Sequence, residues 1–192
     1  MSTFGNKSVK VHDRELVQLS IVPQKSDYTG LFGHYSRSSG VGVNKKALMI
    51  GVNYFRQRGQ LCGSIREVQN MSAYLNLNFG YPRENMVILT DDQRNPFSQP
   101  TRANILRAMC WLVKDVQSND SLVFHYSGHG PQPPSDKEEE EGCDEVIFPV
   151  DFRSAGCIIG IEIYKIMIQG LPAGVKLKTI FDYSYYEGMT IY

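Results

Sequence analysis

Short apolar runs and helical repeats of apolar residues follow one another along most of the chain. The first run, Lys46 to Tyr54, is short and mainly apolar, which is typical of a strand buried on both faces of a sheet. Three runs of the same kind are Met86 to Thr90, Asp120 to Gly130 and Leu177 to Asp182. A short strand pair is expected between Val146 and Asp151. The pattern therefore predicts a sheet of buried strands.

Helical repeats separate these strands. The first ends at a glycine and a proline, and its positions are Ile65, Val68, Met71 and Leu75, followed by Gly80 and Pro82. A second helix is expected after Thr101, a typical N-cap, with one apolar face made of Ile105, Ala108, Met109, Leu112, Val113 and Val116. A third is expected around Ile163 to Ile168, before Gly170. Because strands and helices alternate, we predict an α/β fold, with a mostly parallel sheet and helices on both faces.

The first 45 residues have a different character. Ser, Gly, Lys and Tyr dominate there and no period is sustained, although Val9 to Val22 could form a short strand or helix. We therefore predict a flexible N-terminal extension over residues 1–45 and one folded domain over residues 46–192.

The ends of the predicted strands provide the first candidate site. Parallel sheets carry out chemistry where the carboxyl ends of their strands meet, and those ends are Asn53, His129 and Asp182. Gly128 and Gly130 flank His129, which predicts an exposed imidazole beside reachable main-chain N–H groups. The alternative is that His125 and His129 are ordinary loop histidines.

A nucleophile would be expected opposite this histidine. If the last two predicted strands are neighbours, His129 faces the turn from Asp182 to Gly188. Ser184 is the only candidate nucleophile on that turn.

Composition limits the function classes. With 192 residues, 42% of them apolar, the chain can bury one sizeable core, and a net charge of zero argues against a dedicated nucleic-acid binder. No apolar run reaches the roughly 20 residues of a membrane span and the N-terminus lacks a secretory signal, so we expect no membrane association and a cytoplasmic protein. The cysteines show no C-x-x-C spacing, so neither a zinc site nor a disulfide framework is expected. Reduced thiols are expected at Cys62, Cys110, Cys143 and Cys157.

Several motifs together resemble one peptidase family. They are KALMIGVNYF, QNMSAYL, ENMVILTDD, PTRANILRAM, SLVFHYSGHG, DEVIFPVDF and LPAGVKLKTIFD. Over about Lys45 to Asp182 they resemble a type I metacaspase of the fungal kind. The resemblance implies a caspase-like three-layer sandwich and a Cys-His dyad endopeptidase that cleaves after Lys or Arg, usually with Ca²⁺.

The resemblance also assigns the catalytic positions. His129 matches the catalytic histidine and Gly130 would supply an oxyanion amide, whereas the family motif DSCHSG reads DYSYYEG here, so that Ser184 replaces the nucleophilic cysteine. A serine needs a base that a third group holds in place, and no carboxylate is evident for that role. Residues Tyr185 to Glu187 add bulk and charge to the turn. We therefore expect an inactive member of the family.

A pocket for a basic side chain is better preserved. The matching residues are Glu67, where the family usually has aspartate, Ser127 and Asp182. Two carboxylates could pair with an arginine. The alternatives are that Glu67 is a solvated helix residue and that Asp182 caps the end of its strand.

An acidic stretch could bind calcium. Between Asp136 and Glu145 there are seven acidic residues and one lysine, which could form only a solvated loop. The resemblance implies a calcium site at Asp144 and Glu145, with Glu140 or Glu141 as a possible further ligand.

The resemblance finally concerns the end of the chain. Metacaspases continue past the nucleophile into a small subunit, whereas this chain stops at Tyr192, so we expect only the large-subunit portion of the fold. The strand Leu177 to Asp182 would then be an uncovered edge, which predicts self-association or a protein partner. Besides an inactive endopeptidase homologue with a peptide or protein substrate, the alternatives are a binding module or decoy that pairs with an intact metacaspase paralogue, and a residual Ser-His hydrolase.

Overall fold

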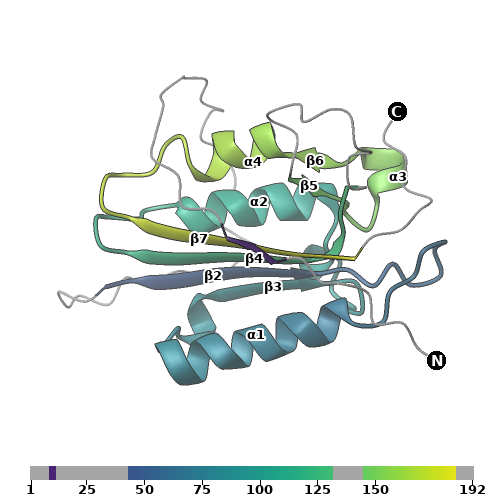
Figure 1. Ribbon diagram of the computed structural model, residues 1–192, viewed down its shortest axis with the longest axis horizontal. Helices are drawn as coiled ribbons and strands as arrows, with labels where there is room; N and C mark the ends of the chain where they lie inside the picture. The colour runs from purple at the N-terminus through teal and green to yellow at the C-terminus, as the bar shows by residue number, and fades with distance from the viewer. Residues whose placement is uncertain (1–8, 12–42, 132–144, 185–192) are drawn as a thin grey trace.

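The computed structural model describes residues 9–11, 43–131 and 145–184. Figure 1 shows a central sheet with helix α1 (Ser64–Phe79) on one side and helices α2 (Arg102–Val113) and α4 (Gly160–Met167) on the other. The predicted α/β fold with helices on both faces of the sheet is therefore confirmed.

The sheet has the strand order β1-β7-β4-β2-β3. Its strands are β1 (Val9–Val11), β2 (Lys45–Gly51), β3 (Met86–Thr90), β4 (Ser121–His129) and β7 (Lys176–Ser184). The four longer strands are mutually parallel and only β1 runs antiparallel, to β7. The remaining short elements are β5 (Val146–Ile147), β6 (Ile158–Ile159), α3 (Phe152–Ala155) and the 3₁₀ turns Arg83–Asn85 and Pro96–Ser98.

Alternate residues of the sheet form two separate cores. On one face, Leu48 and Phe124 pack with Met109 of α2. On the opposite face, Met49 and Val123 belong to the cluster that packs against α1. Since both faces of the central strands are buried, their sequences are nearly continuous apolar runs, as the sequence suggested.

The helix ends follow local signals. The side chain of Thr101 accepts a hydrogen bond from the N–H of Asn104, so the predicted N-cap is confirmed. Gly80 ends α1 with φ = 64°, a left-handed conformation that glycine adopts at no steric cost. The predicted helix around Ile163 to Ile168 begins earlier, at Gly160.

Two buried charged side chains stabilise the sheet at the amino-terminal ends of β2 and β4. Asp120 accepts hydrogen bonds from the N–H groups of Asn44 (3.0 Å) and Gln117 (2.8 Å). Lys46 donates from Nζ to the main-chain oxygens of Trp111 (2.6 Å) and Lys114, and thereby closes the last turn of α2. Burial lowers the pKa of Lys46 to about 8.

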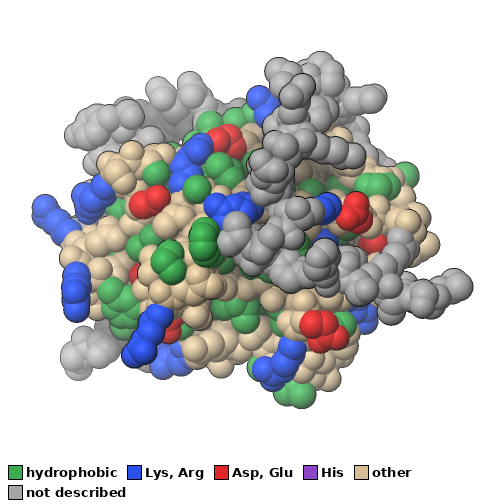
Figure 2. Space-filling view, turned by 180° about the vertical axis from the view of Figure 1, so that it is seen from behind, with side chains coloured by type: hydrophobic (Ala, Val, Ile, Leu, Met, Phe, Trp, Pro, Cys, Tyr) green, Lys and Arg blue, Asp and Glu red, His purple; other side chains and the backbone are tan. Residues whose placement is uncertain are grey.

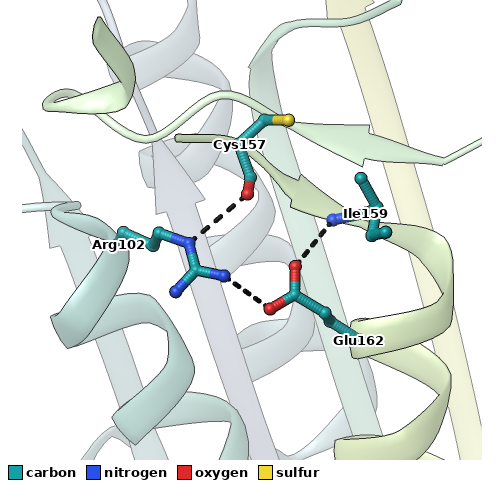
Figure 3. Close-up of polar contacts among 4 residues, drawn as sticks. All are labelled: Arg102, Cys157, Ile159 and Glu162. Carbon is teal, nitrogen blue, oxygen red and sulfur yellow. Dashed lines mark hydrogen bonds and ion pairs between the residues drawn. The ribbon is translucent and has the colours of Figure 1, made fainter. Parts of the chain in front are cut away.

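A polar cluster joins α2 to the segment that follows β5. The guanidinium of Arg102 pairs with Glu162 of α4 and donates to the main-chain oxygen of Cys157, while Glu162 also accepts from the N–H of Ile159 (Figure 3). The N–H of Arg102 donates to Asp151. These contacts connect the two helices on this face of the sheet to β6.

The prediction of a strand pair between Val146 and Asp151 is wrong for the second strand. Strand β5 pairs antiparallel with β6, and helix α3 lies between them. The partner of Val146 is Ile159, which lies beyond the expected range. The pairing was missed because β6 is two residues long and shows no period.

The expectation of an uncovered β7 edge is also wrong for part of that strand. Within the segment assigned to an N-terminal extension, β1 pairs with β7, and its register sets Val9 against Asp182 and Val11 against Ile180. A strand was one of the two alternatives for this stretch. Self-association stays a prediction, and these three residues of β7 no longer support it.

Charged side chains on the surface are mixed. On the face shown in Figure 2, the Lys and Arg side chains of the described residues are scattered, with acidic side chains among them. Within the described ranges, no helix is both long enough and apolar enough to cross a membrane.

Candidate active site

The carboxyl ends of β4 and β7 bring the predicted catalytic positions together. The two strands are neighbours, as the site hypothesis required, and their register places His129 opposite Ser184 and Ser127 opposite Asp182. Strand β7 continues through Ser184, so the first three residues of the expected turn are strand residues. Tyr185 to Gly188 lie outside the described residues.

His129 is buried, and the prediction of an exposed imidazole is wrong. Its relative exposure is 1%, and the ring of Tyr54 stacks on it with a centroid distance of 4.4 Å. Its Nε2 lies 2.6 Å from the main-chain oxygen of Gly59, and its Nδ1 lies 3.2 Å from the main-chain oxygen of Ser184. Both ring nitrogens therefore face carbonyl oxygens.

The two carbonyl contacts bear on the tautomer of His129. A carbonyl oxygen only accepts, and the contact at Nε2 is the shorter of the two, so the geometry favours the neutral tautomer with its proton on Nε2. In the neutral ring, Nδ1 then carries the lone pair and faces residue 184. The main-chain oxygen of Gly59 thus orients the imidazole, which is the role for which the sequence offered no carboxylate.

One oxygen atom meets both of the predicted catalytic groups. The main-chain oxygen of Ser184 accepts a long hydrogen bond from the N–H of Gly130 (3.4 Å) and also lies against Nδ1 of His129. The N–H of Gly130, predicted to be reachable, instead extends the pairing of β4 with β7.

The two glycines beside His129 allow close packing. A Cβ on Gly128 would lie 2.6 Å from Oη of Tyr126 and 3.1 Å from Oη of Tyr54. A Cβ on Gly130 would overlap the ring of Tyr183. The glycines are therefore required by the tyrosines that pack on them, and not by open N–H groups.

A strained loop carries Gly59 to His129. It leaves β2 through Tyr54 and Arg56, which have φ values of 54° and 61°. Asp91, just after β3, accepts hydrogen bonds from the N–H groups of Asn53 (2.9 Å) and Phe55 (3.3 Å). Asn53, the first predicted strand end, holds the start of α1 through its side-chain oxygen, which accepts from the N–H of Ser64.

The three pocket residues come from three neighbouring elements. Glu67 in the first turn of α1 accepts a 2.6 Å hydrogen bond from the hydroxyl of Ser127 in β4, and Asp182 of β7 lies opposite Ser127. Glu67 is therefore engaged with the sheet, and the alternative of a merely solvated helix residue is wrong.

His125 lies in the same strand, two residues before Ser127. It is a buried strand residue, with 2% exposure, and not a loop histidine. Its Nδ1 has no hydrogen-bond partner among the described residues. Burial lowers the pKa of His125 to about 4, and the carboxylate of Glu67 offsets this only in part.

Comparison with known proteins identifies the family of this chain. The family model for the metacaspase, peptidase C14 domain matches residues 45–190. The chain belongs to the metacaspase family. It is 66% identical over 149 residues to metacaspase-1A of Aspergillus clavatus, which covers 77% of this chain and 34% of that protein. It is 64% identical to metacaspase-1 of Emericella nidulans, with coverage of 77% and 36%.

A solved structure supports the fold. Protein GSU0716 from Geobacter sulfurreducens, known as a crystal structure, matches with a TM-score of 0.51 and 25% identity, over 70% of this chain and 48% of that one. The present chain spans about a third of the length of its metacaspase relatives.

A metacaspase calcium site is not assembled by the described residues. Glu145 lies beside Gly160 at the start of α4, and within the described ranges no three His, Cys, Asp or Glu side chains form a group that could hold a metal ion. Asp144, Glu140 and Glu141 lie outside the described residues. Calcium binding therefore stays a prediction, and no step below depends on it.

One of the described cysteines is disfavoured as a substitute nucleophile. Cys62, Cys110 and Cys157 are free thiols, as expected, and Cys143 lies outside the described residues. Burial raises the pKa of Cys110, which disfavours its thiolate.

Proposed function

We propose that this metacaspase homologue binds a basic side chain at Glu67, Ser127 and Asp182 without hydrolysing the peptide that carries it. The observation that carries the proposal is the position of the main-chain oxygen of Ser184, which meets both Nδ1 of His129 and the N–H of Gly130. That oxygen engages the N–H that would stabilise an oxyanion, and it stands before Nδ1 where the hydroxyl of a nucleophile would have to lie, so the two groups cannot act together on a substrate.

The chemistry of serine adds to this argument. A hydroxyl is far less acidic than a thiol and needs the lone pair of the base within about 3 Å of it. Here Nδ1 of His129 meets the main-chain oxygen of Ser184 at 3.2 Å. The register sets His129 beside Ser184, and the atom of Ser184 that Nδ1 meets is the main-chain oxygen, which supports the proposal that the serine is not activated.

Binding of a basic side chain, unlike hydrolysis, needs neither an activated nucleophile nor a general base. Glu67 and Asp182 supply two carboxylates, and the hydroxyl of Ser127 holds Glu67 toward the sheet. Such a pair suits the planar fork of an arginine, with which charge-assisted hydrogen bonds form. A protein that binds without cleaving would act as a decoy for the substrates of an intact metacaspase.

The test separates binding from cleavage. Calorimetric titration with a short peptide that ends in arginine should show binding to the wild type and at least a tenfold loss in Glu67→Gln. The matched control is Glu84→Gln, an exposed glutamate after α1, which should bind like the wild type. Equal binding by all three proteins, or no binding by any, would contradict the recognition half of the proposal.

A second experiment examines the chemistry. A fluorogenic arginine peptide with millimolar calcium is offered to the wild type, to Ser184→Cys and to Ser184→Cys combined with His129→Ala. We expect no turnover in any of the three. Turnover in Ser184→Cys that disappears with His129→Ala would mean that only one atom separates this site from an active metacaspase.

A residual Ser-His hydrolase is the second candidate, and one observation favours it. The hydrogen bond from Nε2 of His129 to Gly59 leaves the lone pair on the nitrogen that faces residue 184. Wild-type turnover that is lost in both Ser184→Ala and His129→Ala would establish this activity and exclude the non-hydrolysing function.

A further inference from the structure

Two tyrosine hydroxyls join the main chain of His129 to that of Phe148. The hydroxyl of Tyr54 donates to the oxygen of Phe148 (2.7 Å) and accepts from the N–H of His129 (3.2 Å). The hydroxyl of Tyr126 donates to the oxygen of His129 (2.8 Å) and accepts from the N–H of Phe148 (3.2 Å). Each hydroxyl thus accepts a hydrogen bond from the N–H of one residue and donates one to the carbonyl oxygen of the other. The two tyrosines connect His129 and Phe148 in opposite senses.

The arrangement accounts for every proton. Each phenol has a single proton, and the shortest contact of each hydroxyl is with a carbonyl oxygen, so we assign both protons there. The hydroxyl of Tyr126 also lies 3.1 Å from that of Tyr54 and 3.4 Å from the oxygen of Phe148. All four main-chain polar groups of the two joined residues are satisfied in this way, in a site that water does not reach. Burial raises the pKa of both Tyr54 and Tyr126, so both phenols remain protonated donors.

We propose that Tyr54 and Tyr126 are positioning residues for His129. Their two hydroxyls link the main chain of His129 to that of Phe148 by hydrogen bonds, and this link holds the imidazole against Gly59. The ring of Tyr54 stacks on the imidazole, so this one residue fixes both the main chain and the ring plane of His129. The position of Gly128, where a Cβ would meet both hydroxyls, leaves room for the pair.

The fastening also connects distant parts of the chain. Phe148 follows strand β5, which lies on the same side of the sheet as α2 and α4 (Figure 1). A displacement of β5 would therefore reach His129 through the two hydroxyls. This inference goes beyond the proposed function, because it holds whether or not the site hydrolyses a peptide.

The experiment reads the ring of His129 directly. Long-range ¹⁵N–¹H NMR of histidine-labelled protein distinguishes a proton on Nε2 from a proton on Nδ1. In the wild type we expect a single Nε2–H tautomer for His129. In Tyr54→Phe and in Tyr126→Phe the contact between Nε2 of His129 and the main-chain oxygen of Gly59 should weaken. The chemical shifts of the ring nitrogens should therefore move toward those of a mixture of tautomers.

Tyr81→Phe is the matched control. Tyr81 is also a buried tyrosine in a hydrogen bond, with Ser121 at 2.9 Å, but it belongs to the core on the α1 face of the sheet. This variant should lose stability and leave the His129 signals unchanged. Unchanged signals in both Tyr54→Phe and Tyr126→Phe, or an equal change in Tyr81→Phe, would overturn the proposal.

Two further measurements keep the test decisive if a tyrosine variant does not fold. In the wild type, the N–H groups of His129 and Phe148 should exchange slowly with solvent, and fast exchange at either would refute the hydroxyl pair. Val146→Ala, a change in β5, should shift the His129 ring signals although the side chain of Val146 makes no hydrogen bond to either hydroxyl. Signals that ignore Val146→Ala would show that the connection to β5 is absent.

Discussion

Replacing His125 with leucine should change how the stability of the protein depends on pH. Burial lowers the pKa of His125 from 6.5 to about 4 in the folded protein, whereas the unfolded chain titrates near the ordinary value. Between these two values the unfolded chain binds one more proton at this position. The stability of the wild type is therefore complete above about pH 6.5 and falls as the pH is lowered toward 4.

The magnitude follows from the shift. One pKa unit corresponds to about 1.4 kcal/mol, so the full effect is about 3 kcal/mol, of which roughly 2.5 kcal/mol is expected by pH 4.5. Leucine does not titrate, and Nδ1 of His125 has no hydrogen-bond partner to lose among the described residues. The neighbours of His125 across the sheet, Met49 and Ile180, are apolar, so leucine should be tolerated at neutral pH.

Urea unfolding of both proteins between pH 7.5 and pH 4.5 measures this effect. Other carboxylates and histidines titrate alike in the two proteins, so they largely cancel in the difference. The free energy of unfolding of the wild type should fall by about 2 to 3 kcal/mol more than that of His125→Leu over this range. Curves that stay parallel within about 0.5 kcal/mol would refute the assignment of His125 as a buried neutral imidazole.

Three other outcomes follow from contacts described above. Asp120→Ala should lower the free energy of unfolding by about 2 to 4 kcal/mol, because two N–H groups lose their acceptor. Glu84→Ala, which removes an exposed carboxylate, should cost under about 0.5 kcal/mol, and equal losses in urea would contradict this. Gly130→Ala should cost more than about 1 kcal/mol through overlap with the packed tyrosine ring, whereas Gly170→Ala, with open space around its Cβ, should not; thermal melts that rank them the other way would refute the close packing. Calcium at millimolar concentration should raise the melting temperature, and Asp144→Ala should remove the rise; a flat titration of the wild type would exclude the site.

Much of the fold could be predicted because its signals are local. Strand β3 has the predicted bounds Met86–Thr90, and Thr101 caps α2 as its sequence position indicates. The meeting of His129 and Ser184 could also be predicted, because parallel neighbouring strands end at one edge. Period, capping residues and topology suffice for such statements.

The rest could not be predicted because it depends on main-chain atoms and tertiary packing. Gly59 acts through its carbonyl oxygen, for which no residue type is a signal. The burial of His129 follows from the stacked ring of Tyr54, which lies 75 positions away in the sequence. The tyrosine of the YSGHG motif was visible, but its reciprocal bonds to Phe148 could be assigned only from the assembled fold.

The rate at which the buried Lys46, beside Trp111, reacts with a reagent can measure a local opening of the protein. Amine-directed acylating reagents attack only a neutral amine that they can reach, and Lys46 in the folded protein is 2% exposed. Exposed lysines such as Lys114 are labelled at once, whereas Lys46 becomes accessible only when the end of α2 separates from β2. The rate at which mass spectrometry detects an acyl group on Lys46 therefore reports how often that corner of the protein opens.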